Sequence, residues 1–327
     1  MYIGILQIIE KKGVFNLKKI LISCPVSNRD WILPYYLNHI YDIEYDKSMI
    51  DIYWIVNNCS KKDKTLDMLR DFKKKHKNKY NSITIEIYNS KIIFDKNFQD
   101  SRVKHIRDEK TYKWLAKLRN KILKKAISLN CDYLLSVDSD ILVKPDILNR
   151  LLEHDKDIVS SLIYNGYLYK PKKTPKDYDP IKKAYKYPNI MKDIGFICPI
   201  CRMENLYQNN TFINYTQKRQ FCMKCKKQVE TKHKLYTHIV NNRVKKPEKC
   251  PKGKLLRVDF TGACILISNE VCKKAKYDVN KTYGEDEPFC FSARDVGFEL
   301  WCDVSVYSQH IMSKDLLEKF KNTLDKF

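Results

Sequence analysis

The sequence has 327 residues but no continuous apolar run of about eighteen, the length that a membrane-spanning helix requires. Residues 1–9 are mostly apolar, but Glu10 and Lys11 follow directly, and the basic start, longer apolar core and cleavage site of a signal peptide are missing. No internal repeat is present. These absences predict a cytoplasmic protein without a transmembrane segment.

Acidic residues are too few to balance the basic ones, with 39 Asp and Glu against 62 Lys and Arg, and the net charge is +23. Residues 166–258 hold most of the excess, with 23 basic and 6 acidic residues and a charge of +17, against +6 for the rest of the chain. A local excess of this kind is typical of a surface that binds a polyanion. Compositional drift toward lysine is the alternative explanation.

Apolar residues make up 43% of the sequence, enough to form a folded core. Short apolar runs predict strands at residues 19–24, 50–57, 82–88, 133–137, 158–164, 258–268 and 298–304. Helical periodicity and start signals predict helices at residues 30–40, 61–76, 111–129, from 145, 288–296 and 314–327. This alternation predicts an α/β fold with a mostly parallel central sheet and helices on both faces.

Two carboxylates, Asp138 and Asp140, follow the predicted strand at 133–137. In an extended segment, residues two apart point to the same side, and open α/β sheets bind ligands at the carboxyl ends of their strands. Two hard oxygen ligands suit Mg²⁺ or Mn²⁺ bound together with a diphosphate. Taken alone, the motif is also typical of a surface turn.

Three later features are weaker when each is taken alone. Residues 261–264 (TGAC) precede an acidic segment at 284–290 (GEDEPFC), and His310 follows a strand-like run. Acidic residues before a proline often only begin a helix, where they favour its dipole. A lone histidine is more often structural than a metal ligand.

The order of these motifs resembles that of GT-A glycosyltransferases of the family-2 type. The motifs are, in order, residues 25–29 (PVSNR), residues 57–60 (NNCS), Arg119-Asn120 on a helix, Asp138-Ser139-Asp140, residues 261–264, residues 284–286 and His310. The resemblance covers about residues 19–163 and 258–310 and omits the basic segment.

The resemblance implies roles for these residues. The nucleotide-sugar donor would be held by Pro25, Ser27, Arg29, Asn57, Asn58, Arg119, Asn120 and Asp138. Asp138, Asp140 and His310 would bind Mn²⁺ or Mg²⁺, and Asp286 would be the catalytic base with Glu285 supporting it. The family usually has an acid in the second loop, where this chain has Asn57 and Asn58, so the base of the donor is left open.

These roles agree with the chemistry of sugar transfer. A divalent cation stabilises the charge that builds on a departing nucleoside diphosphate. The sugar passes through an oxocarbenium-like state, and a carboxylate on its far face can take the acceptor proton. This arrangement predicts inversion at the anomeric carbon, with retention as the alternative.

Four of the 12 cysteines form two C-x-x-C pairs twenty residues apart, and they are Cys198, Cys201, Cys222 and Cys225. In a reducing compartment this spacing favours a tetrahedral structural Zn²⁺ over disulfides or free thiols. Cys250 and Cys264 are spare candidates. A small insertion with little apolar content needs such a metal in order to fold. The segment is therefore predicted to be a zinc-ribbon-like insertion.

The chain is thus predicted to contain four parts, namely a nucleotide-sugar-binding half (1–165), a basic zinc-ribbon-like insertion (166–257), an acceptor and catalytic half (258–312) and a C-terminal amphipathic helix (313–327). Tyrosines interleave with lysines in the insertion, which favours an anionic acceptor such as DNA with a hydroxymethylated base. A solvated lysine-rich surface and an anionic glycan or lipid headgroup are the alternatives.

Two other classes of protein compete with a glycosyltransferase. A zinc-ribbon nucleic-acid-binding protein with an inactive α/β body would keep the cysteines and the charge but would not need Asp138, Asp140 or Asp286. A nucleotidyltransferase that makes nucleotide sugars normally has a glycine-rich phosphate loop after its first strand. Residues 25–29 contain no glycine, so this class ranks third.

Overall fold

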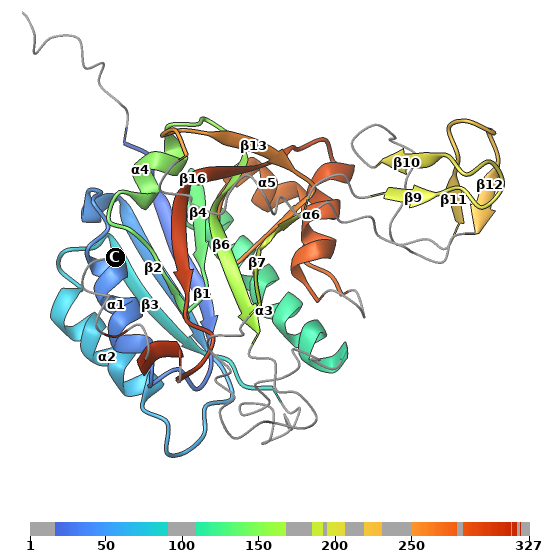
Figure 1. Ribbon diagram of the computed structural model, residues 1–327. Helices are drawn as coiled ribbons and strands as arrows, with labels where there is room; N and C mark the ends of the chain where they lie inside the picture. The colour runs from blue at the N-terminus through green and yellow to red at the C-terminus, as the bar shows by residue number, and fades with distance from the viewer. Residues whose placement is uncertain are drawn as a thin grey trace, which may run out of the picture.

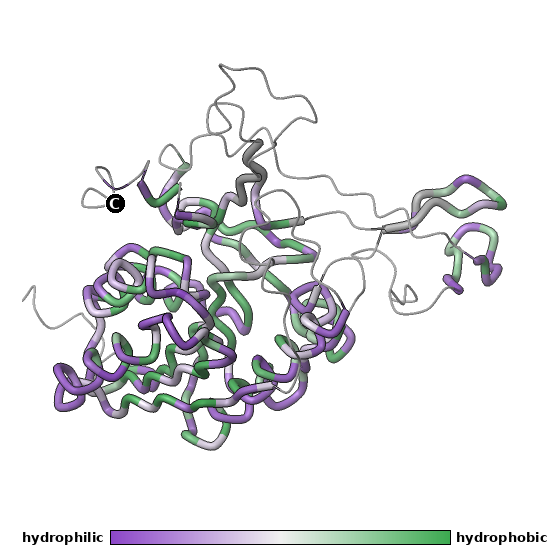
Figure 2. The backbone as a smooth tube through the Cα atoms, turned by 90° about the horizontal axis from the view of Figure 1, so that it is seen from below, coloured by the Kyte–Doolittle hydropathy of each residue, from purple (hydrophilic) through white to green (hydrophobic). Residues whose placement is uncertain are grey.

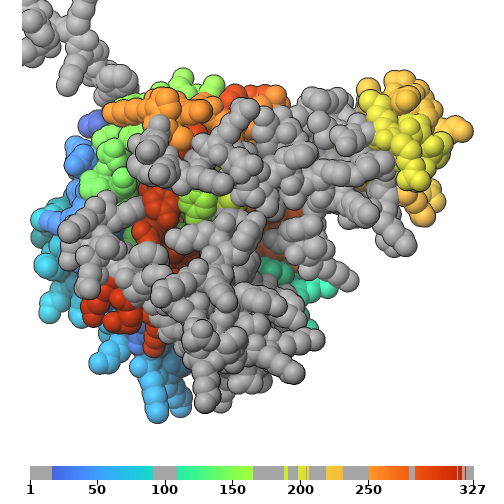
Figure 3. Space-filling view, viewed as in Figure 1, coloured from blue at the N-terminus to red at the C-terminus, as the bar shows by residue number. Residues whose placement is uncertain are grey.

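The computed structural model describes residues 17–90, 109–167, 185–191, 195–206, 219–230, 250–279, 284–314, 316–318 and 321. Most of these residues form one α/β body around a central sheet, and two small cysteine-containing hairpins lie to one side of it (Figure 1). The same hairpins stand at the edge of the molecule in the space-filling view (Figure 3). Within the described residues, no helix combines the length and the apolar composition needed to cross a membrane.

The main path of the central sheet has the strand order β13-β16-β6-β15-β4-β1-β2-β3. These strands are β1 (Ile20–Val26), β2 (Ile50–Val56), β3 (Ser82–Ile87), β4 (Tyr133–Val137), β6 (Ile158–Tyr167), β13 (Leu255–Val258), β15 (Cys264–Ser268) and β16 (Leu300–His310). Strands β3, β2, β1 and β4 are parallel, whereas β15 runs antiparallel between β4 and β6. The sheet is therefore mixed, with a parallel half that contains the first four strands.

Both faces of this sheet are covered, and the apolar residues of each face pack in a separate core cluster. In β2, Tyr53 and Ile55 pack in one core cluster, and Ile52 and Trp54 pack in the other. The first cluster is covered by α3 (Glu109–Ser128), α5 (Asn269–Lys274) and α6 (Asp286–Asp295), and the second by α1 (Leu33–Tyr41), α2 (Thr65–His76) and α4 (Ile147–Leu152). Figure 2 shows this apolar interior along the strands. The predicted α/β fold with helices on both faces is confirmed.

The remaining elements are short. They are the 3-10 helix η1 (Lys47–Met49), β5 (Ile141–Leu142), which pairs with β16, β7 (Tyr185–Pro188), which pairs with β6, and β8 (Ile190–Met191), which pairs with β14 (Phe260–Thr261). The two hairpins are β9 (Gly195–Ile197) with β10 (Glu204–Leu206), and β11 (Arg219–Phe221) with β12 (Gln228–Glu230).

Several predicted boundaries need correction. The helix expected from residue 61 begins at Thr65, after a turn. The helix expected from residue 30 begins at Leu33, because Pro34 suits only its first turn. The strand expected at 258–268 is interrupted by a turn at Gly262 and Ala263, and the strand expected to end at 304 continues to His310. Most of the predicted C-terminal helix lies outside the described residues.

The strand order reverses between β1 and β4, which makes their carboxyl ends a topological switch point. The two strands pair only as far as Ser23 and Ser136. Beyond that point the carbonyl of Val137 accepts a hydrogen bond from the Tyr36 hydroxyl at 3.3 Å. The residues that follow β4 are therefore released from the neighbouring strand and can face a ligand.

Candidate active site

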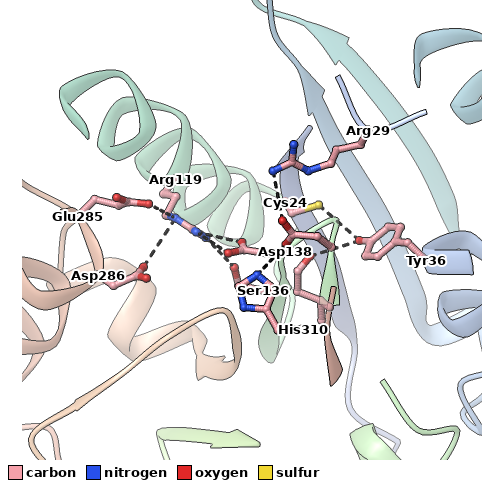
Figure 4. A network of polar contacts seen from close by, with 11 residues as sticks. Cys24, Arg29, Tyr36, Arg119, Ser136, Asp138, Glu285, Asp286 and His310 are labelled. Carbon is pink, nitrogen blue, oxygen red and sulfur yellow. Dashed lines mark hydrogen bonds and ion pairs between the residues drawn. The ribbon is translucent and has the colours of Figure 1, made fainter. Parts of the chain in front are cut away.

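A buried arginine on α3, Arg119, joins carboxylates from two distant parts of the chain (Figure 4). Its Nη2 lies 2.9 and 3.1 Å from the two oxygens of Asp138, just after β4. Its Nε lies 3.2 Å from Glu285 Oε1 and 3.8 Å from Asp286 Oδ1, where α6 begins. The guanidinium therefore assembles the two halves of the site, although Arg119 and Glu285 are 166 positions apart.

Burial and charge act in opposite directions on this cluster. Burial by itself would lower the pKa of Arg119, but the charges of Asp138, Asp286 and Glu285 raise it well above its usual value. Burial raises the pKa of Asp138, Arg119 lowers it, and nearby Asp140 raises it again. The positive charge of Arg119 therefore offsets part of the cost of burying the Asp138 carboxylate.

Asp140 lies between two basic side chains. Arg29 Nη2 is 3.2 Å from its Oδ2, and His310 Nε2 is 3.6 Å from its Oδ1. Its backbone carbonyl also accepts a hydrogen bond from Ile311 N at 2.9 Å. The end of β16 is thereby tied to the turn after β4, so Asp140 and His310 come together as a pair.

The side chains of Asp140 and His310 suit a divalent cation whose other ligands come from water or substrate. Among the residues that the structure describes, three or more ligand atoms of His, Cys, Asp or Glu gather within 4.8 Å only at the four cysteines. Asp138 faces Arg119, so Asp140 and His310 would supply the protein ligands. Mg²⁺ commonly takes one or two carboxylates and completes its shell with water and substrate phosphates.

A strained turn holds Asp138 and Asp286 in place. Cys264 N donates to Gly262 O at 2.9 Å, and Ala263 between them has φ +66°, a region that non-glycine residues seldom adopt. The carbonyl of Ala263 accepts a hydrogen bond from Asp138 N at 2.9 Å. A Cβ placed on Gly262 would lie 2.7 Å from Asp286 Oδ2. Glycine is therefore required here so that the carboxylate can approach the turn.

We expect Gly262→Ala to lower kcat by about 10- to 100-fold, because its methyl group must displace the Asp286 carboxylate. The contact involves the end of a side chain, so thermal unfolding should change little. Initial rates of the catalysed reaction would measure the effect. Gly297→Ala is the matched control. No atom of the described residues lies within 4 Å of a Cβ placed on Gly297, but the φ of this residue is +96°, so the substitution should lower stability and leave turnover intact. Full turnover in Gly262→Ala would contradict the close approach.

The loops after β1 and β2, predicted to hold the nucleoside, interlock through asparagines. Asn28 has a left-handed backbone, with φ +52°. Its Oδ1 accepts a hydrogen bond from Ser60 N at 2.8 Å, and its Nδ2 donates one to Asn58 O at 3.3 Å. Asn58 has φ +46° and its backbone N donates to Asn89 Oδ1 at 2.8 Å. Ser27 accepts a further hydrogen bond from Asn28 Nδ2 at 3.3 Å. The two loops therefore form one rigid rim beside the switch point, and Pro25 stands within β1.

Two of the predicted nucleotide-facing amides make internal hydrogen bonds. Asn57 Nδ2 donates to Val26 O at 3.2 Å, and its Oδ1 accepts from Trp114 Nε1 at 3.4 Å. Asn120 donates to the carbonyl of Tyr277 at 2.8 Å and accepts from its backbone N at 2.9 Å. Asn120 therefore anchors the segment that leads to α6.

Sequence reasoning missed two residues that surround Arg119. The ring of Tyr277 lies 5.6 Å from the guanidinium carbon and stacks on Phe289. Ser136 Oγ accepts from Arg119 Nη1 at 3.4 Å. Ser136 is two residues before Asp138 on the same strand face, so alternation was a usable signal. No local pattern marks Tyr277.

The four predicted cysteines form two matching turns. Cys198 N donates to Met203 O at 2.9 Å and Cys222 N to Lys227 O at 3.0 Å. The residue after each second cysteine has a left-handed backbone, with φ +59° at Arg202 and +56° at Lys226.

The sulfur atoms of these cysteines lie close together but form no disulfide bonds. All four lie within 4.8 Å of one another, and the pairs Cys198–Cys225 and Cys201–Cys222 are 3.7 and 3.4 Å apart, far longer than a disulfide. The buried Asn205 adds a hydrogen bond from Nδ2 to Cys222 Sγ at 3.6 Å, and its Oδ1 accepts from Met223 N at 3.0 Å. This group is suited to hold a metal ion.

The mixed sheet, the helices on both faces and the carboxylates after β4 define an α/β protein with a candidate ligand site at the carboxyl ends of its strands. The chain belongs to the Anp1 family, whose model matches residues 7–181. It is 23% identical over 177 residues to a glycosyltransferase 25 family member of Aedes aegypti, covering 52% of this chain and 27% of that protein. A second such relative, of Anopheles gambiae, is 21% identical over 155 residues, covering 47% and 25%. The chain thus matches about a quarter of the length of these curated relatives.

Two solved structures match the chain over most of its length. Staphylococcus aureus TarS has a TM-score of 0.42 and 13% identity, over 94% of this chain and 39% of that one. GalNAc-T7 with UDP, GalNAc and Mn²⁺ has a TM-score of 0.48 and 14% identity, over 91% and 44%.

Proposed function

We propose that this protein is a glycosyltransferase that moves a sugar from a nucleotide-sugar donor to an acceptor hydroxyl with the help of Mn²⁺ or Mg²⁺. The observation that carries the proposal is the cluster around Arg119, which contacts Asp138 just after β4 and Glu285 and Asp286 at the start of α6. Membership of the Anp1 family and the names of the curated relatives support the same class. The resemblance to the family-2 type stays a prediction.

The roles of the residues follow from their positions. Asp140 and His310 would hold the cation, which when bound stabilises the charge on the departing diphosphate as a Lewis acid. Asp286 would accept the proton of the attacking hydroxyl. Arg119 contacts Asp286 at 3.8 Å and would fix its direction. This base is proposed to lie opposite the leaving group, so that transfer would invert the anomeric carbon.

A panel of nucleotide-sugar donors with Mn²⁺ tests this function. Nucleoside diphosphate release would be measured for each donor, with and without DNA and with EDTA. We expect release from one donor class that EDTA abolishes. DNA binding without release from any donor would instead favour a nucleic-acid-binding protein with an inactive body.

The acceptor is proposed to be anionic. The described hairpins expose five basic side chains, which are Arg202, Arg219, Lys224, Lys226 and Lys227. The lysine-rich segment at 170–192, predicted to contact DNA, lies largely outside the described residues. Salt-sensitive DNA binding that is lost when its lysines are neutralised would support a polynucleotide acceptor. Equal turnover with and without DNA, on a simple sugar acceptor, would dismiss it.

We further propose that Cys198, Cys201, Cys222 and Cys225 hold a structural Zn²⁺. Four thiolates in matching turns provide the closed tetrahedral set of such sites. The protein should contain about one zinc per chain, and Cys222→Ser should abolish zinc retention and expose residues 195–206 and 219–230 to proteolysis, because binding and local folding are coupled. Metal analysis and limited proteolysis would measure both effects. Cys250→Ser is the control and should retain zinc; a zinc-free parent chain with protected hairpins would contradict the site.

A further inference from the structure

The most informative contact outside the Arg119 cluster is the ion pair of Arg29 with Asp140. Arg29 Nη2 lies 3.2 Å from Asp140 Oδ2, and the two side chains are 28% and 14% exposed. Asp140 is the carboxylate to which the proposed function assigns the divalent cation. A guanidinium and a metal ion are both positive, so they compete for this oxygen.

The backbone of Arg29 is anchored, so that its side chain alone can change partners. Arg29 N donates to Thr65 Oγ1 at 2.8 Å, and its carbonyl accepts from the backbone N of Ile32 and Leu33 at 3.0 and 2.8 Å. Asn28 before it is held by Ser60. The guanidinium is less constrained: Nη1 makes a 3.4 Å contact with Ser27 O.

Arg29 also has an unused donor. Its Nε is buried and has no hydrogen-bond partner among the described residues. A guanidinium presents a planar fork that matches phosphate oxygens, and charge-assisted bonds of this kind are strong. Arg29 stands on the loop after β1 at the switch point, where open α/β sheets bind ligands. A diphosphate bound at this edge would accept hydrogen bonds from both Nη atoms and from Nε of Arg29.

We propose that Arg29 is an exchangeable counterion: it occupies the metal-binding carboxylate of Asp140 when the site is empty and transfers to the donor diphosphate when the cation binds. This inference rests on the proposed function and adds a coupling to it. The donor draws Arg29 away from Asp140 and so strengthens metal binding, and by linkage the metal strengthens donor binding by the same factor. No covalent step is involved.

Arg29→Met tests the exchange through binding alone. Mn²⁺ affinity would be measured from the EPR signal of free Mn²⁺, first without nucleotide and then with UDP or GDP. Without nucleotide, Arg29→Met should bind Mn²⁺ about threefold more tightly than the parent chain, as for loss of a partly exposed ion pair. The gain in Mn²⁺ affinity that nucleotide produces should shrink by a similar factor. A purely through-space effect of the lost charge would leave this gain unchanged.

Two further variants serve as controls. Arg70→Met removes one positive charge from an exposed position on α2, 59% exposed, and should leave both affinities unchanged. Arg29→Lys keeps the charge but not the fork, and should restore only part of the coupling. Thermal unfolding and circular dichroism would verify that each variant is folded.

The outcomes separate this inference from the proposed function. Unchanged or weaker Mn²⁺ binding by folded Arg29→Met, or an unchanged nucleotide-induced gain, would overturn the exchange while donor turnover by the parent chain still supports a glycosyltransferase. A parent chain that binds no Mn²⁺ would overturn both the exchange and the metal requirement.

Discussion

Asp286→Asn should lower kcat by about two to four orders of magnitude, the usual contribution of general base catalysis, while donor binding changes little. The amide has nearly the same shape but cannot accept the proton of the acceptor hydroxyl. Arg119 would still be held by Asp138 and Glu285, so the site should stay assembled. Single-turnover rates and the Kd of the donor would separate chemistry from binding.

The competing explanation for Asp286 is that it only begins α6, where an acidic residue favours the helix dipole. That role would cost about 0.3–1 kcal/mol of stability and would leave kcat intact. Asp295→Asn, an exposed change near the end of the same helix, is the matched control and should turn over normally. Full turnover by Asp286→Asn would remove it from the catalytic role.

Asp140→Asn should abolish Mn²⁺-dependent turnover, with a loss of at least about 10³-fold. Asparagine loses the charge that binds the cation and leaves His310 as the only other proposed protein ligand. Mn²⁺ titration by EPR in the absence of donor should show the loss of binding directly, independent of activity.

Asp146→Asn is a suitable comparison for this change. Asp146 lies six residues further on, its side chain is 44% exposed, and its carboxylate lies 3.9 Å from Arg150 Nη1. It should bind Mn²⁺ and turn over as the parent chain does. If Asp140→Asn retained Mn²⁺ affinity, the cation would have to bind elsewhere.

Much of the fold could be predicted from the chain. The runs that form β1, β2 and β4 are mostly apolar, which is typical of strands buried on both faces, and the run that forms β3 alternates. The intervening segments have helical spacing. Two features escaped local patterns. The antiparallel entry of β15 between β4 and β6 depends on long-range pairing, and the turn at Gly262 and Ala263 is stabilised by its contact with Asp138.

The candidate site divides in the same way. Asp138 and Asp140 were recognisable from their spacing after an apolar strand, and the cysteine pairs from theirs. The residues that these groups contact were not recognisable from the sequence. The Asp138 carboxylate contacts Arg119 and the Asp140 carboxylate contacts Arg29, although the two aspartates are only two residues apart. Asn120, expected to face the nucleotide, instead anchors Tyr277.

The α/β class, the carboxylates after β4 and the paired cysteines are predictable from the amino-acid sequence, because each depends on periodicity or on spacing between near neighbours. The contacts of Arg119 with Asp138, Glu285 and Asp286, and of Arg29 with Asp140, depend on how the folded chain packs. These contacts join segments up to 166 positions apart. A buried charge is costly unless it is paired with an opposite charge. This cost arises only when the packed chain excludes water, so local sequence patterns do not reveal the pairs.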